Sequence, residues 1–205
     1  MIIAVDGPAA SGKGTLARKL AQYLGLAYLD TGAIYRTIAL IVVKSGGDPQ
    51  NESDAVAAAK KYRPHMYPDA ALRSEEVSKA SSIVAAHAKV RAEVIGIQRK
   101  VANTPPGAVL DGRDIGTIVC PEAGVKFFVT ASAEERARRR RKELEARGEP
   151  SDHASILQEI IRRDERDRTR PVAPLKPAPD AYLLDTTSLD IEATFQAARR
   201  VVDGH

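Results

Sequence analysis

The chain has 205 residues, a formal net charge of +4 and 28% charged side chains, a composition that is ordinary for a soluble globular protein. No apolar run approaches the roughly 20 residues that span a bilayer, and the single cysteine, Cys120, excludes an internal disulfide. Because an apolar strand is expected from Ile2 onward, no signal peptide fits before it, and we predict one cytoplasmic domain over residues 1–205.

The first predicted unit is a strand over residues 2–5, a glycine-rich loop and a helix over residues 13–24. Glycines let backbone N–H groups point at phosphate oxygens, the helix N-terminus adds partial positive charge, and Lys13 supplies a point charge. This order indicates a phosphate-binding loop for ATP. Its residues are Gly7, Pro8, Ala9, Ala10, Ser11, Gly12, Lys13, Gly14 and Thr15.

The residue that follows Lys13 indicates which kind of phosphate-binding loop this is. Ser or Thr usually stands there, with its hydroxyl on Mg²⁺, but here Gly14 occupies the position and Thr15 follows. The Gly-Lys-Gly-Thr order resembles the loop of nucleoside monophosphate kinases. The resemblance implies a metal held largely through waters, which suits an ion that gives up its water reluctantly. Thr15 is a candidate metal ligand.

A second strand–turn–helix unit follows, with a strand over residues 27–29 and a helix over residues 33–44. Thr31 lies in the turn and Arg36 in the first turns of the helix, where they are placed to bind a second phosphate. A helix with an ordinary cap explains the same residues. The motif by itself leaves both interpretations open.

Residues 45–74 interrupt the alternation of strands and helices with Gly and Pro clusters at 46–49 and 63–68. We predict an irregular excursion on one side of the core, with a helix over residues 53–62. Ser74 is followed by two glutamates, which is typical of a helix start. A long helix is therefore predicted over residues 75–102.

The strand predicted over residues 108–110 leads directly into Asp111. An acid at the end of an apolar strand is well placed to face Mg²⁺ or its waters, although a simple cap of the next turn is the alternative. Arg113 and Asp114 follow, at the edge of an open α/β sheet where ligands bind. We predict Asp111 as a metal-holding residue that acts through water.

A fourth strand is predicted over residues 125–129 and a helix over residues 133–147, which carries an unbroken basic run from Arg138 to Lys142 after Arg136. Like charges at this spacing repel one another unless anions are near. Three interpretations of this basic run are open. It forms a solvated helix face, it binds RNA, or it belongs to a lid whose arginines bind the transferring phosphates. The phosphate-binding loop upstream favours the lid.

The last part of the chain combines charged and proline-rich segments. A helix is predicted over residues 155–166, and if it continues, Arg163, Asp167 and Arg170 share one face, which suits a phosphate and a ribose. A salt-bridged helix end is the alternative. Prolines exclude a helix or central strand over residues 170–179. A strand over residues 182–184 and a helix over residues 191–202 complete the chain.

This order predicts an α/β fold with an open parallel sheet of about five strands and helices on both faces, of the phosphate-loop NTPase type. We predict a short substrate-binding excursion and a helical lid in addition. The expected subregions are residues 1–44, 103–132 and 171–205 for the core, residues 45–102 for binding a nucleoside monophosphate, and residues 133–170 for the lid.

The motifs together resemble those of the bacterial cytidylate kinases, over nearly the whole chain outside residues 45–74. Many members of that family have Ser where Thr31 stands, and the longer members carry a β-rich insertion where residues 45–74 are short and broken by prolines. The segments that carry the resemblance are 7–15, 29–36, 80–86 with Val90 and Arg91, 111–117 and 163–175.

The resemblance implies transfer of the γ-phosphoryl group of ATP, with Mg²⁺, to CMP or dCMP. Ser82, Arg91 and Asp114 would contact the cytosine, since Asp accepts from the exocyclic amine and Arg donates to the ring nitrogen and carbonyl. Thr31 would also contact CMP. Arg36, Arg113 and Arg170 would hold the acceptor phosphate, Arg163 and Asp167 would lie near ribose and phosphates, and Arg136 and Arg140 would lie near adenine and the transferring phosphoryl. The implied catalytic residues are Lys13, Arg113, Arg140 and Arg170.

Two other functions remain as alternatives to CMP phosphorylation. One is a kinase of another small acceptor, such as UMP or a hydroxyl metabolite like shikimate, for which Asp30 or Asp114 would serve as the base. The other is an RNA-binding, nucleotide-dependent module that uses the arginine run. We expect ATP and CMP or dCMP as partners, no nucleic acid, no membrane and a monomeric protein.

Overall fold

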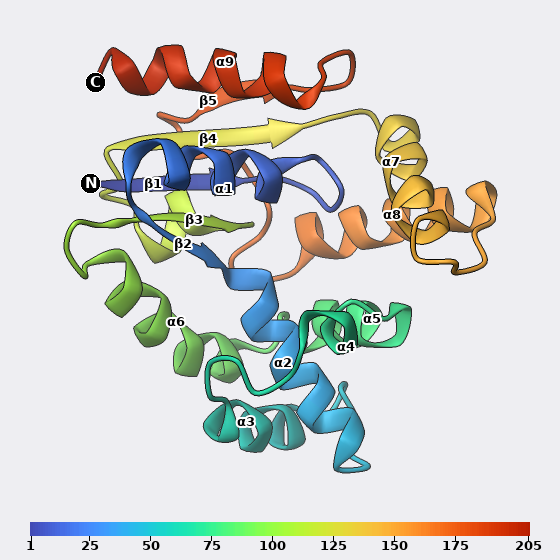
Figure 1. Ribbon diagram of the computed structural model, residues 1–205. Coiled ribbons are helices and arrows are strands. Elements are labelled where there is room, and N and C mark those ends of the chain that lie inside the picture. The colour runs from blue at the N-terminus through green and yellow to red at the C-terminus, as the bar shows by residue number, and fades with distance from the viewer.

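The computed structural model describes residues 1–205. Five strands are connected by helices, with a group of consecutive helices between β2 and β3 and the pair α7 and α8 between β4 and β5 (Figure 1). The elements are β1 (Ile2–Asp6), α1 (Lys13–Leu24), β2 (Ala27–Asp30), α2 (Thr31–Lys44), α3 (Glu52–Lys61), α4 (Asp69–Leu72), α5 (Glu75–Val84), α6 (Ala88–Ala102), β3 (Ala108–Gly112), the π-helical turn η1 (Ile115–Val119), β4 (Val125–Thr130), α7 (Ala133–Glu145), α8 (His153–Thr169), β5 (Tyr182–Asp185) and α9 (Ile191–Asp203).

The five strands form one parallel sheet in the order β2-β3-β1-β4-β5. The register pairs Asp6 of β1 with Gly112 of β3, and Asp30 of β2 with Asp111 of β3. Because all strands run the same way, their carboxyl ends meet at one edge, toward α7 and α8 (Figure 1). The predicted α/β fold with a five-stranded parallel sheet is confirmed, and this edge positions the site.

Apolar side chains cover both faces of the sheet, which explains why its strands are continuous apolar runs. Within β1, Ile3 and Val5 pack against α1 and α9 on one face. Ala4 packs on the other face, with the end of α6 and with η1. Cys120 is buried beside η1 in this second cluster, as expected for a small apolar residue, and burial raises the pKa of its thiol to about 11.

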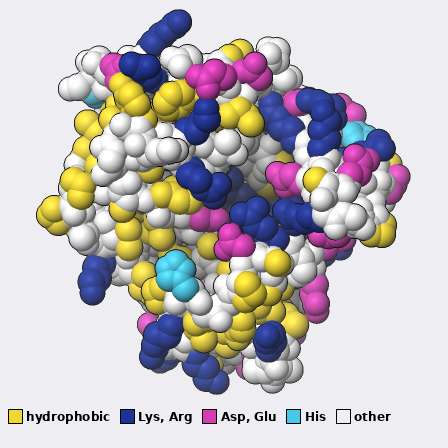
Figure 2. All heavy atoms as spheres, in the orientation of Figure 1, with side chains coloured by type: hydrophobic (Ala, Val, Ile, Leu, Met, Phe, Trp, Pro, Cys, Tyr) yellow, Lys and Arg dark blue, Asp and Glu magenta, His cyan; other side chains and the backbone are white.

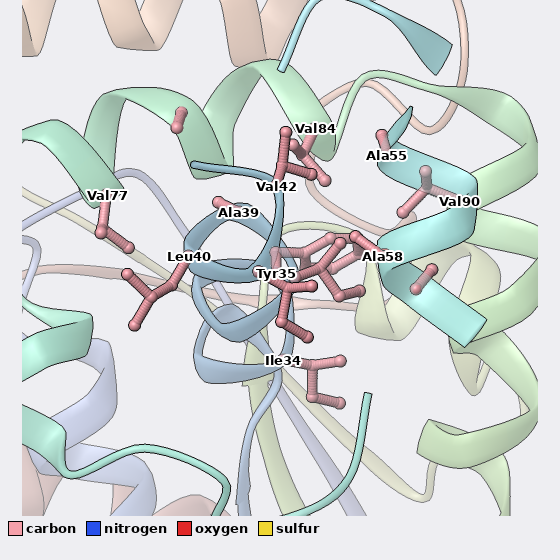
Figure 3. Close-up of a cluster of buried hydrophobic side chains, with 14 of the residues drawn as sticks. Ile34, Tyr35, Ala39, Leu40, Val42, Ala55, Ala58, Val77, Val84 and Val90 are labelled. Carbon is pink, nitrogen blue, oxygen red and sulfur yellow. The ribbon is translucent and has the colours of Figure 1, made fainter. Parts of the chain in front are cut away.

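A second core lies outside the sheet, between α2 and the helices α3, α5 and α6 (Figure 3). α2 is apolar on most of its surface, and Ile34, Ile38 and Val42 are fully buried, as expected for a helix surrounded by protein. Val84 of α5 and Val90 of α6 pack against it (Figure 3). This core fixes residues 45–102 next to the carboxyl edge of the sheet.

The prediction of one helix over residues 75–102 is wrong, because the chain turns at residues 85–87 between α5 and α6. The turn exposes the Ala85 carbonyl oxygen, which accepts a hydrogen bond from Arg91 Nη1 at 3.1 Å. His87 Nε2 lies 2.9 Å from the Pro49 carbonyl oxygen. Helical periodicity continues across the turn, so the sequence gives no indication of these tertiary contacts.

Other element boundaries also differ from the prediction. Within residues 45–74, α3 confirms the predicted helix over residues 53–62, and the short α4 was not predicted. Asp152 caps α8, which extends beyond the predicted residues 155–166 at both ends. Residues 170–179 form no helix or strand, as their prolines predict. None of the helices combines the length and the apolar character that crossing a bilayer requires.

Candidate active site

A cleft of about 420 Å³ opens at the carboxyl edge of the sheet. Its walls come from the phosphate-binding loop, the ends of β2 and β3, and helices α5, α7 and α8. Figure 2 shows Lys and Arg side chains gathered around this hollow. Convergent positive charge of this kind concentrates anionic ligands. The cations that line the cleft include Lys13, Arg18, Arg36, Arg113, Arg140 and Arg163.

The loop of residues 7–15 has the backbone that phosphate binding requires. Gly12 lies at φ 89°, and a Cβ at Gly7 would lie 2.0 Å from the Val129 carbonyl oxygen. Glycine is the residue that fits both positions. α1 begins at Lys13, so its N-terminus adds partial positive charge at the same cleft.

Lys13 is the cation within this loop, and its Nζ donates to the Pro8 carbonyl oxygen at 3.3 Å. Burial, together with the charge of Arg113, lowers the pKa of Lys13 from 10.5 to about 7, while Asp111 and Asp30 oppose the change. Phosphates beside the amine would favour its charged form and raise this pKa again. Binding of phosphates beside Lys13 would therefore be accompanied by proton uptake at its amine.

We expect ATP binding at about pH 8 to take up about one proton at Lys13, because an amine with a pKa near 7 is mostly neutral there until phosphates arrive. Titration calorimetry in buffers of different ionisation enthalpy measures this uptake. The Lys13→Met variant is expected to show none beyond that of the nucleotide itself. Equal uptake by the two proteins would contradict the expectation.

Two carboxylates, Asp30 and Asp111, end the neighbouring strands β2 and β3. Both oxygens of Asp30 are engaged, one by a backbone N–H at the start of α2 at 3.0 Å and one by Arg36 Nη2 at 2.7 Å. The Asp111 carboxylate accepts from the Tyr28 hydroxyl alone, on Oδ2 at 2.7 Å. Its Oδ1 has no protein donor, and the exposed Thr15 on α1 lines the same cleft. Hard oxygen ligands beside a phosphate-binding loop fit Mg²⁺.

The pKa values of these two carboxyl groups shift in opposite directions. Burial and the nearby Asp30 charge raise the pKa of Asp111, although Lys13 and Tyr28 oppose the rise. Burial also acts against ionisation of Asp30, but the ion pair with Arg36 outweighs it and lowers the pKa of Asp30. A divalent cation near Asp111 would favour its ionised form.

Three arginines near the cleft have a buried N–H group without a hydrogen-bond partner, namely Arg36 Nε, Arg163 Nε and Arg170 Nη2. Burial and the adjacent Arg113 charge lower the pKa of Arg163 to about 10. Arg113 itself donates from Nε to Asp167 at 2.9 Å. Buried donors are normally paired, so this cluster of charged, unpaired donors favours an anion between them.

The residues implied to contact the base do not line the cleft, although Asp114 directly follows the cleft-lining Arg113. Asp114 and Arg91 form a buried ion pair, and Arg170 Nη2 lies 3.9 Å from the second oxygen of Asp114. Ser82 is buried on α5, and its hydroxyl accepts from Arg166 Nε at 3.3 Å. The structure thus brings Arg91, Asp114 and Arg170 together. It adds Arg166, which the sequence analysis did not single out.

Some arginines of α7 contact other parts of the protein, and others face the cleft. Arg136 is buried between α7 and α8, where Nη1 and Nη2 donate to the two carboxylate oxygens of Asp164 at 3.0 and 2.6 Å. Its Nη1 also lies 3.3 Å from the Ala9 carbonyl oxygen of the loop. Arg140 lines the cleft and pairs with Glu143 at 3.1 Å. Arg136 therefore joins α7 to α8 and to the phosphate-binding loop, whereas Arg140 lines the cleft and has only a surface partner.

Arg139 was missed by the sequence analysis and binds the phosphate-binding loop directly. Its Nη1 donates to the Ser11 carbonyl oxygen at 3.3 Å and to the Thr186 hydroxyl at 2.9 Å, and its Nη2 to the Thr186 carbonyl oxygen at 2.5 Å. A run of adjacent arginines hides which one faces the loop. The usable signal is the i, i+3 spacing from Arg136, which places both on one helix face.

Thr31 lies deeper than the cleft. Its side chain is buried, and its hydroxyl donates to the Asp111 carbonyl oxygen at 2.7 Å. It therefore ties the start of α2 to the end of β3, which holds Arg36 and Asp111 in a fixed relation. Asp167 is also buried, where it accepts from Arg113.

Comparison with known proteins points to one family for this chain. A family model described as cytidylate kinase matches residues 3–203. Proteins named cytidylate kinase from Bradyrhizobium diazoefficiens and Rhodopseudomonas palustris (strain HaA2) are 55% and 54% identical over 203 residues, which cover 99% of this chain and 96% of each relative. A shikimate kinase structure from Bacteroides thetaiotaomicron has a TM-score of 0.53 at 14% identity and covers 99% of this chain and 98% of its own. A gluconokinase structure from Sinorhizobium meliloti has a TM-score of 0.51 at 12% identity, covering 98% and 93%. These two structures share the fold.

Proposed function

Because this chain belongs to the cytidylate kinase family, we propose that it transfers the γ-phosphoryl group of ATP to CMP or dCMP and releases ADP with CDP or dCDP. The observation that carries the proposal is the buried cluster of Arg91, Asp114 and Arg170 beside a cleft lined with cations. A carboxylate accepts from an exocyclic amine and a guanidinium donates to a ring nitrogen and carbonyl, which is the pattern of cytosine.

The donor half of the reaction belongs to the phosphate-binding loop. Backbone N–H groups of residues 7–15 and the N-terminus of α1 would cradle the ATP phosphates, with Lys13 beside them. Asp111 would hold Mg²⁺ through water, with Thr15 as the candidate direct ligand. When bound, the ion neutralises charge on the transferring phosphates. Arg140, which faces the cleft, would add positive charge at the same place.

The acceptor phosphate would lie among the arginines with unpaired N–H groups, Arg36, Arg163 and Arg170, together with Arg113. A nucleoside monophosphate has a second pKa of about 6, so its attacking oxygen is already ionised at neutral pH. The step therefore needs alignment and charge neutralisation rather than a general base. No histidine lines the cleft, in agreement with this chemistry.

The resemblance implied that Arg136 lies near adenine, but in the structure this side chain is occupied by a protein partner. Arg136 binds Asp164 with both terminal nitrogens, so we propose that it supports ATP binding by holding the Ala9 carbonyl. Arg139 bridges Ser11 and Thr186, and we propose that it forms the wall against which the nucleotide base rests. We also propose a cytoplasmic, monomeric enzyme without a nucleic-acid partner.

The test is release of ADP from ATP and Mg²⁺ across a panel of CMP, dCMP, UMP, AMP, shikimate and gluconate. We expect strong turnover with CMP and dCMP and weak turnover with UMP, because uracil lacks the amine that Asp114 accepts, which costs about 1–3 kcal/mol. Turnover with a hydroxyl acceptor alone, or with none of the panel, would contradict the proposal. The hydroxyl-acceptor kinase and the RNA-binding module are not favoured by the family membership of the chain.

A further inference from the structure

Tyr28 is a β2 residue that no part of the proposed mechanism uses, yet it contacts the metal-holding carboxylate. Its hydroxyl donates to Asp111 Oδ2 at 2.7 Å, across the pair of strands β2 and β3. The Arg18 guanidinium lies 5.0 Å from the centre of its ring, and the ring lines the cleft. The phenol is therefore held in place from two sides.

Gly14 explains why the phenol can reach this position. A Cβ on Gly14 would lie 3.0 Å from Asp111 Oδ2 and 3.6 Å from the Tyr28 hydroxyl. These are the atoms that a Ser or Thr side chain after the loop lysine would meet. The space beside the Gly-Lys-Gly-Thr loop is thus filled by a phenol that donates to Asp111 and comes from another strand.

The hydrogen bond from Tyr28 also determines which oxygen of the Asp111 carboxylate is available to a ligand. Both oxygens of Asp30 are engaged by protein donors, and Tyr28 engages Oδ2 of Asp111. Of the four carboxylate oxygens of Asp30 and Asp111, Oδ1 of Asp111 is therefore the one that has no protein donor. A phenol that fixes Oδ2 also fixes the direction in which Oδ1 points.

We propose that Tyr28 is a positioning residue for the metal site, which fixes the Asp111 carboxylate so that Oδ1 holds a water of the nucleotide-bound Mg²⁺. The inference rests on the proposed function, since it takes the metal to be the partner of ATP in the cleft. It concerns a residue of β2 that would act through Asp111 and would not itself contact the metal or the nucleotide phosphates.

The test is the gain in nucleotide affinity that Mg²⁺ brings, measured by titration calorimetry with a non-hydrolysable ATP analogue in EDTA and in excess Mg²⁺. For Tyr28→Phe we expect this gain to fall by about tenfold, the loss typical of one hydrogen bond to a charged group, with the affinity in EDTA unchanged. Tyr23→Phe is the matched control, because its hydroxyl also donates to a carboxylate, Asp203 at 3.0 Å, on the exposed surface.

A double-mutant cycle separates positioning from simple packing. Asp111→Asn is expected to lower the Mg²⁺ gain by at least as much as Tyr28→Phe without removing it, and adding Tyr28→Phe to it is expected to change nothing more. An unchanged gain in Tyr28→Phe, a further loss in the double variant, or no gain from Mg²⁺ in the unsubstituted protein would each overturn the proposal. Thermal melting confirms that the variants fold. CMP phosphorylation by the unsubstituted enzyme is a separate readout, so failure of the proposed function would be recognised independently.

Discussion

The Asp114→Asn variant is expected to lose on the order of 100-fold in kcat/KM for CMP, while its activity with UMP rises relative to that with CMP. Asp114 is buried between Arg91 and Arg170, so the substitution removes a charge that both cations face. Breaking a buried ion pair from one side costs about 3–5 kcal/mol, because the remaining charge stays buried. The amide that replaces the carboxylate is able to donate to the uracil carbonyl, which the carboxylate cannot do.

The measurement is kcat/KM for CMP and for UMP with each protein, and the decisive quantity is the ratio between the two substrates. Asp180→Asn serves as a control, because it also removes a carboxylate that pairs with a buried cation, Lys126 at 2.8 Å, but Asp180 is exposed and takes no part in the cluster of Arg91, Asp114 and Arg170. It is expected to leave the substrate ratio unchanged. If Asp114→Asn lowered kcat/KM for CMP and for UMP equally, Asp114 would stabilise its cluster with Arg91 and Arg170 without contributing to recognition of the base.

The fold was predictable because its signals are local. Apolar runs that stop at Asp6, Asp30 and Asp111 mark strands whose carboxyl ends must meet in a parallel sheet, and glycines at the loop mark the one conformation that binds phosphate. The turn at residues 85–87 was not predictable in this way. It depends on hydrogen bonds from Arg91 and to Pro49, which are made only after the chain has folded.

The candidate site was predictable as a set of residues but not as a set of contacts. Each cation in the basic run of α7 is equivalent by sequence, whereas the structure assigns Arg136 to Asp164 and Arg139 to the phosphate-binding loop. Arg166 and Tyr28 act on other side chains of the site. Such partners have no motif of their own, since their positions follow from how α8 and β2 pack against the rest of the molecule.

Arg163→Met is expected to lower kcat by about 10²- to 10³-fold, the loss typical of removing one preorganised charge that stabilises a transition state. Arg163 lines the cleft with a buried, unpaired Nε, next to the charges of Arg113 and Arg36. Met keeps the length and the apolar stem of the side chain but has no donor. Phosphoryl transfer would then lack one of the cations that neutralise the acceptor phosphate.

The same substitution is expected to raise the Tm of the nucleotide-free protein by a few degrees. Burial and Arg113 lower the pKa of Arg163 to about 10, so the charged form is disfavoured in the folded state relative to the unfolded state. That cost is present in full at neutral pH, begins to fall as the pH rises through about 10, and disappears only above the ordinary pKa of arginine. An apolar side chain removes it, which stabilises the protein.

Arg163→Met is thus expected to lower kcat but to raise the Tm. Substitution of a residue that only supports the fold would not raise the Tm, so the two measurements together distinguish a catalytic charge from a structural one. Arg162→Met is the matched control, because Arg162 is the exposed neighbour of Arg163 on α8 and does not line the cleft. Thermal melts with and without CMP complete the test. CMP is expected to raise the Tm of Arg163→Met by less than that of the unsubstituted protein, because the phosphate loses a charged partner. A variant that was both inactive and less stable without nucleotide would show instead that Arg163 holds α8 in place.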